Sequence, residues 1–343
     1  MFESIGAPRG PNWKLRFVCL ALILALMLGL GWLLRMTQMP LQSYKGALPQ
    51  LLPEQSELAD RLSATVNHLS AAIGDRSIPR VGSLESTAEY LGSNLRQAGY
   101  AVTEHKYSVA GEEVSNVEVS LPGSDSASGA IIVGAHYDSV AGTVGANDNA
   151  SGVAAVIELA RLLQGSKLRK TVRFVLFVNE EPPYFQTNHM GSLVYARQLR
   201  LERIPVSAMI SLETIGFYSD APGSQKYPPV LGYFYPTHGD FIGFVGNTES
   251  RDLVRRSIRT FRESTGFPSQ GLAAPADWPG IGWSDHWSFW QEGYPAIMIT
   301  DTAPFRYPYY HTPLDTSDKM DFKKMARVVE GVRRVVESLA REP

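Results

Sequence analysis

The sequence predicts an α/β fold: a three-layer sandwich around a central mixed, mostly parallel sheet, preceded by one N-terminal transmembrane helix. Residues 131–133 and 172–178 are nearly continuous runs of β-branched and aromatic side chains, which are typical of strands buried on both faces. Such strands alternate with segments of helical periodicity, the order that a largely parallel sheet requires. Residues 17–34 form an unbroken apolar run that is long enough to cross a bilayer.

The composition is that of a globular protein with a large core. The chain has 343 residues, 44% of them hydrophobic, which suffices for one large domain or two smaller ones. Residues 41–343 hold 28 basic and 33 acidic side chains, a balance that excludes the basic face demanded by nucleic acid. Cys19 is the single cysteine, which excludes an intramolecular disulfide and a cysteine-based metal site. Any metal would therefore be held by His, Asp and Glu.

The apolar run near the N-terminus predicts a membrane anchor. As a helix, residues 17–34 span about 27 Å. Arg9, Lys14 and Arg16 precede the run, which places the N-terminus in the cytoplasm and the rest of the chain outside, in the periplasm or the extracellular space. A cleavable signal peptide is the alternative, but Arg35 and the residues after it offer no small-x-small cleavage site.

We expect three regions: residues 1–35 as a cytoplasmic stub and anchor, residues 36–53 as a linker, and residues 54–343 as one catalytic domain. Two helices open this domain, over residues 58–73 and 83–98. Ser83 is the expected N-cap of the second helix, and Gly99 its stop.

The remainder of the chain alternates strand and helix. The predicted strands cover residues 101–107, 114–120, 130–135, 172–178, 207–212 and 296–300. The predicted helices cover residues 149–163, 190–200, 249–263 and 319–340. Residues 216–236 and 265–282 fit no regular element and are rich in Pro, Gly and aromatics. Long loops in a compact domain are usually functional, so we expect these two to form the walls of a ligand pocket.

Acids and histidines follow the predicted strands at their carboxyl ends. They are His136, Asp138, Asp148, Glu180, Glu181, Glu213 and His311. In open α/β sheets these strand ends meet at one edge, where ligand sites lie. Carboxylates crowded together there are costly unless cations neutralise them.

Each fragment alone has a commoner explanation, such as a helix cap for Asp148 or a solvated pair for two adjacent glutamates. Taken together they predict two metal ions. Two Zn²⁺ would be balanced by three carboxylates and one hydroxide, and a bridging carboxylate can hold two ions about 3.5–4 Å apart. Asp138, two residues after His136, can accept the imidazole N–H and fix the ligand tautomer.

Six motifs extend this pattern in chain order between about residues 80 and 335. They are His136-Tyr137-Asp138-Ser139, Asn147-Asp148-Asn149-Ala150-Ser151-Gly152, Asn179-Glu180-Glu181, Glu213, Ser284-Asp285-His286 and Tyr310-His311-Thr312-Pro313. The combination resembles the metallopeptidase family that contains bacterial leucyl-type aminopeptidases, glutamate carboxypeptidases and, more distantly, glutaminyl cyclases.

The resemblance implies a site for two zinc ions. Asp148 would bridge them, with His136 and Glu213 completing one site and Glu181 and His311 the other. Many members of the family carry Asp where this chain has Glu213, so this ligand differs by one methylene.

The resemblance also assigns roles to residues that do not bind metal. Glu180 is the expected general base, ionised at neutral pH because zinc and nearby donors lower its pKa. Tyr310 is expected to donate a hydrogen bond to the oxyanion, although it could equally be a packing tyrosine. Asp285 is expected to line the site and meet the substrate, with a helix cap as the alternative reading.

The expected activity is that of a zinc aminopeptidase acting on peptides outside the cytoplasm. A glutaminyl cyclase-type acyltransferase would use one zinc. A carboxypeptidase or dipeptidase would need a basic clamp, for which Arg173, Arg197 and Arg306 are candidates. A receptor on a peptidase fold would typically lack ligands or the base, and this chain retains them all.

Overall fold

The structure is a computed structural model that describes residues 13–342. The chain divides into two compact units, Met1–Gln38 and Met39–Pro343. The described part of the first unit is α1 (Trp13–Thr37), within which Arg16–Thr37 has a mean hydropathy of 2.7 and is long enough to cross a membrane. Residues 1–12 of the predicted cytoplasmic stub lie outside the described residues.

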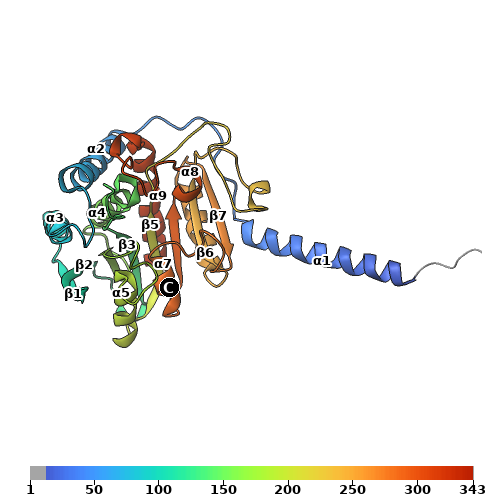
Figure 1. Cartoon of the computed structure of the whole chain (residues 1–343), viewed down its shortest axis with the longest axis horizontal. Helices are drawn as coiled ribbons and strands as arrows, with labels where there is room; N and C mark the ends of the chain where they lie inside the picture. Colours follow the sequence, from blue (N-terminus) through green and yellow to red (C-terminus); the bar gives the residue numbers. More distant parts are fainter. Residues whose placement is uncertain (1–12, 343) are drawn as a thin grey trace, which may run out of the picture. The chain divides into compact units, whose positions relative to one another are not determined.

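The second unit is built on one mixed sheet of eight strands (Figure 1). The strands are β1 (Thr103–Val109), β2 (Glu112–Leu121), β3 (Ala130–His136), β4 (Val172–Phe177), β5 (Val206–Glu213), β6 (Ile242–Asn247), β7 (Ser269–Ala274) and β8 (Ala296–Thr300). Their spatial order is β1-β2-β4-β3-β5-β8-β6-β7. The central run β4-β3-β5-β8 is parallel, as is β6-β7, and the other pairs are antiparallel. The predicted fold class is confirmed.

Helices cover both faces of the sheet (Figure 1). The larger core lies under α2 (Pro53–Asn67), α3 (Ser83–Gln97), α4 (Gly152–Leu163), α6 (Arg251–Ser264) and α9 (Phe322–Arg341). The smaller core lies under α5 (Gly191–Leu201) and α7 (His286–Gln291). A further short helix, α8 (Ala303–Arg306), follows β8.

The central strands are apolar throughout because both of their faces are buried. In β3, Ile131 and Val133 enter the larger core, whereas Ile132 between them enters the smaller core. This alternation follows from the two-residue period of a strand. It explains why the predicted strands are continuous apolar runs, and it leaves their carboxyl ends as the place where polar residues can gather.

The structure differs from the sequence prediction at several elements. The stretch 265–282, expected to be a loop, contains β7, and β6 was also missed. Both strands contain glycine, which weakens the strand signal. Ser83 is not the N-cap of α3: Gly82, with φ +74°, holds that position, and the Ser83 hydroxyl donates to the Ser77 carbonyl. The first predicted helix is α2 continued by a π-helical turn, His68–Ile73.

Residues 38–52 form no helix or strand, but from Met39 onward they lie along the second unit. Arg262 donates from Nη1 to the carbonyl oxygens of Pro40 (2.9 Å) and Leu41 (2.8 Å). Arg327 donates to the Pro49 carbonyl. The segment is therefore fastened to α6 and α9, and the predicted linker boundaries at residues 36 and 53 stay a prediction.

Candidate metal centre

The strand ends bring the predicted ligands together. His136 is the last residue of β3 and Glu213 the last residue of β5. Asp148 lies in the turn Ala146–Ser151 that leads into α4, where its own backbone is not helical (φ −111°, ψ 92°). Glu181 follows the end of β4. These four residues are buried, whereas the side chain of His311 is 34% exposed.

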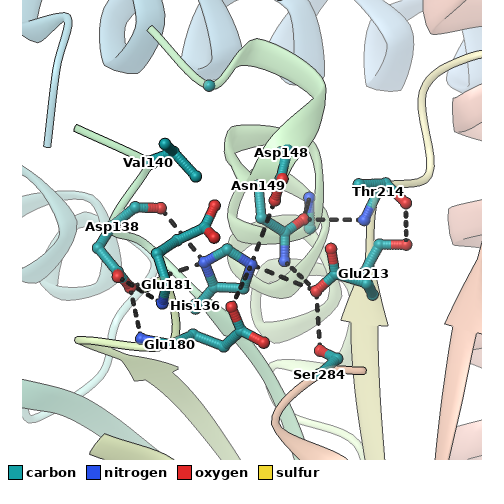
Figure 2. A network of polar contacts seen from close by, with 12 residues as sticks. His136, Asp138, Val140, Asp148, Asn149, Glu180, Glu181, Glu213, Thr214 and Ser284 are labelled. Carbon is teal, nitrogen blue, oxygen red and sulfur yellow. Dashed lines mark hydrogen bonds and ion pairs between the residues drawn. The ribbon is translucent and has the colours of Figure 1, made fainter. Parts of the chain in front are cut away.

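Asp148 lies between two groups of donor atoms. His136 Nε2 lies 3.4 Å from Asp148 Oδ1 and 3.2 Å from Glu213 Oε2 (Figure 2). His311 Nε2 lies 3.1 Å from Asp148 Oδ2 and 3.3 Å from Glu181 Oε2. One carboxylate thus presents one oxygen to each group, which is the arrangement of a bridging ligand.

The donor set fits a pair of zinc ions. Ligand atoms about 2.0–2.2 Å from a tetrahedral ion lie about 3.3 Å from one another, close to the observed separations. Among the described residues, the buried oxygens Asp148 Oδ2 and Glu181 Oε1 have no hydrogen-bond partner. Donor atoms of His136, Asp148 and Glu181 all lie within 4.8 Å of one another, as do those of His136, Glu180 and Glu213. Glu180 therefore reaches the same space as the ligands, with its Oε2 at 3.9 Å from His136 Nε2.

The pKa values of several clustered side chains are raised, which shows that the site favours positive charge. Burial raises the pKa of Glu180 well above its usual range, and the carboxylates of Glu181 and Glu213 raise it further. Burial and the charge of Asp148 raise the pKa of Glu181 to about 8. Burial opposes a charge on His311, but its contacts with Asp148 and Glu181 raise its pKa to about 10. Cations in the cluster would relieve the same repulsion and hold the acids ionised.

The Asp138 carboxylate holds the backbone of two neighbouring acids in place. Its Oδ1 and Oδ2 accept the backbone N–H groups of Glu180 and Glu181, each at 3.1 Å. His136 Nδ1 donates to the Asp138 carbonyl oxygen at 3.2 Å and lies 3.6 Å from the carboxylate (Figure 2). In the neutral ring that contact leaves Nε2 as the unprotonated nitrogen, which faces Asp148 and Glu213, and this is the tautomer a metal ligand needs.

Arg76 braces the loops beside the cluster, a role for which the sequence offered no signal. Its side chain is fully buried and donates to backbone carbonyl oxygens from three segments of the chain. These oxygens belong to Leu69, Gly74, Tyr137, Val144 and Gly145, at 2.7–3.1 Å. The guanidinium thus ties the residue after His136 to the loop that carries Asp148.

Asp315 fixes the backbone of Asp148, the predicted bridging ligand. Its carboxylate accepts the N–H groups of Asn147 (2.9 Å) and Asp148 (3.0 Å). Tyr307 donates its hydroxyl to Asp315 Oδ1 at 2.7 Å. Asp315 is 167 residues from Asp148 along the chain, so spacing alone could not have linked them.

Glu213 is held by residues from two further segments. Ser284 donates to Glu213 Oε2 at 2.7 Å. Asn149 donates to the Leu212 carbonyl (2.8 Å) and accepts from the Thr214 N–H (3.1 Å), which ties the start of α4 to the end of β5. The side chain of Glu213, longer by one methylene than the Asp that the resemblance leads us to expect, is therefore held by a hydrogen bond from Ser284.

The backbone is strained around the ligands. Asn179 (φ +60°), Thr214 (φ +45°) and His311 (φ +56°) all adopt left-handed conformations that non-glycine residues rarely take. Each is a predicted ligand or lies within two residues of one. Strain of this kind concentrates at functional sites, where surrounding contacts hold it in place.

Tyr310 and Asp285 occupy different positions relative to the cluster. The Tyr310 ring stacks on His311 with centroids 3.8 Å apart, and burial raises its pKa well above its usual range, so its O–H remains a donor. Asp285 is fully buried at the N-terminus of α7, and burial raises its pKa to about 7. Its side chain makes no N-cap hydrogen bond, and its expected contact with substrate stays a prediction.

His286 is a buried residue of α7 that belongs neither to the predicted ligands nor to the general base. It is fully buried, its Nε2 lies 2.7 Å from the Ile281 carbonyl, and its ring meets Trp290 edge-on. Burial lowers its pKa to about 4, so the neutral ring donates to that carbonyl at neutral pH.

An apolar pocket adjoins the cluster at Glu213 and Tyr310. It has about 780 Å³ of empty space, counting its open mouth. Its floor is formed by β6, β7 and β8. Its walls come from the two stretches that the sequence predicted for this purpose and from the segment after β8, which contains Phe305. The lining includes Tyr227, Leu231, Tyr235, Val245, Leu272, Ile281, Trp283, Met298 and Phe305.

Comparison with known proteins agrees with this geometry. Residues 116–336 match the family described as peptidase family M28. The chain is 40% identical over 300 residues to YfbL, an uncharacterized protein of Escherichia coli (strain K12), covering 85% of this chain and 91% of that protein. It is 27% identical over 215 residues to aminopeptidase YwaD of Bacillus subtilis (strain 168), covering 60% of this chain and 40% of YwaD.

Solved structures share the fold. BSAP, a zinc aminopeptidase from Bacillus subtilis, matches with a TM-score of 0.67 at 17% identity, over 83% of this chain and 95% of that one. Glutaminyl cyclase of Porphyromonas gingivalis matches with a TM-score of 0.60 at 20% identity, over 82% and 98%. Both likenesses show the fold alone. The family match and the identity to YfbL show more: the chain is a member of peptidase family M28, a family of metal-binding hydrolases.

Proposed function

We propose that this protein is a two-zinc aminopeptidase that releases N-terminal residues with apolar side chains. The observation that carries the proposal is the position of Asp148, which offers one oxygen to His136 and Glu213 and the other to His311 and Glu181. His136, Asp148 and Glu213 would hold one ion, and Asp148, Glu181 and His311 the other.

The residues around the ions have separate tasks. Two zinc ions, when bound, would polarise the scissile carbonyl and lower the pKa of a water molecule towards 7. Glu180 takes the proton of the attacking water and passes it to the leaving amine. Tyr310 donates its hydroxyl to the developing oxyanion, a role its protonated state supports. Asp138 keeps Glu180 and Glu181 in place through their backbone N–H groups.

The apolar pocket lies directly beside the carboxylate cluster, and this arrangement supports cleavage at a free N-terminus. Glu213 and Tyr310 border both regions. A substrate whose first side chain fills the apolar pocket places its ammonium group beside the carboxylates, which attract a cation. The apolar lining supports a preference for large hydrophobic or aromatic first residues.

A carboxypeptidase would need a cation for the substrate carboxylate, and the three candidate arginines are engaged elsewhere. Arg173 pairs with Glu118, and Arg197 pairs with Glu292. Arg306 is buried and donates to the Phe241 carbonyl. These contacts favour the aminopeptidase over a carboxypeptidase.

The decisive experiment screens the purified full chain, with zinc counted per chain. We expect Leu- and Phe-nitroanilides to be cleaved, their N-acetylated forms to resist, and zinc to approach two ions per chain. Cleavage of blocked substrates would refute the aminopeptidase. An N-terminal glutamine peptide that loses ammonia and keeps its length, with one zinc per chain, would instead establish a glutaminyl cyclase.

We further propose that α1 is an uncleaved anchor and that the second unit lies outside the cytoplasm. Arg16–Thr37 has the length and hydropathy of a membrane span, and Arg9, Lys14 and Arg16 favour a cytoplasmic N-terminus. N-terminal sequencing of the membrane-bound protein should read from the initiator region. Protease added outside the intact membrane should digest the second unit. A mature N-terminus after residue 35 would overturn the anchor.

A further inference from the structure

Residues 227–236 form a projecting loop that exposes apolar side chains. The loop reads Tyr-Pro-Pro-Val-Leu-Gly-Tyr-Phe-Tyr-Pro and has no charged residue. The Tyr233 side chain is 92% exposed and Val230 is 49% exposed. Contiguous exposed apolar residues of this kind mark a surface that something else covers.

Contacts within the loop hold it in this shape. Tyr227 and Tyr235 stack with centroids 5.6 Å apart, and the Tyr227 hydroxyl donates to the Pro236 carbonyl at 2.6 Å. Leu231 is buried beneath the tip. Val230 and Tyr233 are therefore already exposed at the tip of the folded loop.

The base of the loop is fixed to edge strand β7. The Tyr235 hydroxyl donates to the Gly271 carbonyl at 2.7 Å. Met39 packs on the same residue, since a Cβ on Gly271 would come within 2.7 Å of Met39 Cγ. The loop and the first residues of the second unit thus meet on one strand.

A short stretch of chain joins this strand to the proposed membrane anchor, on which the inference rests. Met39 follows Thr37, the last residue of the apolar segment, by two residues. Two residues reach at most about 7 Å. A bilayer that holds the apolar helix therefore has its surface near β7, and tyrosines are the side chains that settle at the lipid–water boundary.

We propose that residues 227–236 dock into the lipid–water interface of the bilayer that holds the N-terminal helix. Tyr227, Pro228, Leu231 and Tyr235 belong to this loop and also line the apolar pocket. The proposal therefore places the loop side of the pocket at the membrane surface. The enzyme is then suited to peptides that lie on the membrane, whose apolar N-terminal residues reach the pocket without first crossing water.

The experiment places a spin label on the loop of the full chain. Cys19 is the only cysteine, so Cys19→Ser gives a background in which a single nitroxide can be attached at Tyr233→Cys or Val230→Cys. Leu201→Cys, at the end of α5, is the control because Leu201 is also apolar and 84% exposed. Each labelled chain is reconstituted in nanodiscs of phosphatidylcholine and phosphatidylglycerol, and collision rates with oxygen and with a nickel chelate are measured. Melting curves that match the unlabelled chain establish that each variant is folded.

We expect labels at positions 230 and 233 to meet the nickel chelate several-fold less often than the label at position 201, and oxygen more often. That result means immersion in lipid, since the nanodisc contains no other partner for the loop. Equal nickel accessibility at all three positions would overturn the proposal and would leave a protein partner as the occupant of this surface. Because the readout is independent of hydrolysis, it stands or falls separately from the proposed aminopeptidase activity.

Discussion

The metal centre and the apolar pocket meet at Glu213 and Tyr310, but the chain builds them differently. The centre sits on the ends of parallel strands, and carboxylates clamp its ligands through backbone N–H groups, as Asp138 and Asp315 do. The pocket has strands for a floor and long loops for walls. Those walls are held by stacked rings and by hydroxyl groups that donate to carbonyl oxygens, as in Tyr227 and Tyr235.

This difference in construction means that one region would carry out the reaction and the other would select the substrate. A ligand that moves by half an ångström changes the chemistry for every substrate, and strand ends provide that precision. A loop that moves by the same amount changes which side chain fits. Substitutions in the two regions should therefore have distinguishable effects: loss of rate or metal in the centre, and altered preference in the pocket.

The largest expected effect is in the centre, at Glu180. Glu180→Gln removes the base and keeps nearly the same volume, so hydrolysis should fall by about 10²- to 10⁴-fold, or about 3–5 kcal/mol in the barrier. Zinc should remain at the wild-type ratio, measured by elemental analysis beside kcat. Loss of zinc in this variant would make Glu180 a ligand, and full activity would end its assignment as the base.

The next effect is at the buried residue His286 and depends on pH. The pKa of His286 is lowered to about 4 in the folded state, against about 6.5 when unfolded. Between these two pH values the unfolded chain binds a proton that the folded chain does not. His286 therefore lowers the free energy of unfolding as pH falls from 6.5 to 4, and it has no such effect above pH 6.5. The full cost is about 3 kcal/mol.

His286→Gln can keep the donor to Ile281 but does not titrate. Urea unfolding of both proteins at pH 7, 5.5 and 4.5 should show the wild type losing more stability than the variant. The carboxylates of the metal centre titrate in both proteins, so their contribution cancels when the two free energies of unfolding are subtracted. Parallel curves would mean that His286 does not have a lowered pKa.

A change to the pocket floor should alter preference without altering the centre. Val245 lines the floor and is paired with Met298 and Leu272 in the sheet. Val245→Phe fills part of the cavity, so the ratio of kcat/KM for Phe- over Ala-nitroanilide should fall by about 10- to 200-fold. Val81→Phe, at a valine that is 90% exposed, is the matched control and should change nothing. An unchanged ratio in Val245→Phe would place the substrate side chain elsewhere.

The smallest effect is on the support of the bridging ligand. Asp315→Asn turns one acceptor into a donor facing the N–H groups of Asn147 and Asp148, and zinc affinity should fall by about 10- to 100-fold. Asp318→Asn is the control, because that nearby acid has a side chain 67% exposed. Competition with a chelator measures both. Wild-type affinity in Asp315→Asn would show that the turn holds Asp148 without this carboxylate.

Sequence patterns predicted the parts of the molecule whose signal is local. Residues 130–135 and 172–178 are apolar because both faces of the sheet are covered, and the ligands follow those strands directly. The structure brings His136, Asp148, Glu180, Glu181, Glu213 and His311 to one edge, as the strand-end argument expects.

The residues that escaped prediction act at long range or lack a strong local signal. β7 contains Gly271 and alanines, so it resembles loop, and only its pairing with β6 makes it a strand. Arg76 and Asp315 serve backbone groups about 60 to 170 residues away, and no spacing rule connects such positions. Tertiary contact, not local propensity, decides these roles.

Arg76 also limits how far a recombinant fragment of this protein can be shortened at its N-terminus. It lies 40 residues before the segment 116–336 that matches the family, yet its guanidinium binds the carbonyl oxygen of Tyr137 and those of Val144 and Gly145 in the loop that precedes Asp148. A recombinant fragment trimmed to the matched segment would lack this arginine, and it would also lack α2, which packs on α4 and α9. The shortest fragment worth expressing for assays or crystals therefore starts upstream of Pro53, although those first helices supply no ligand.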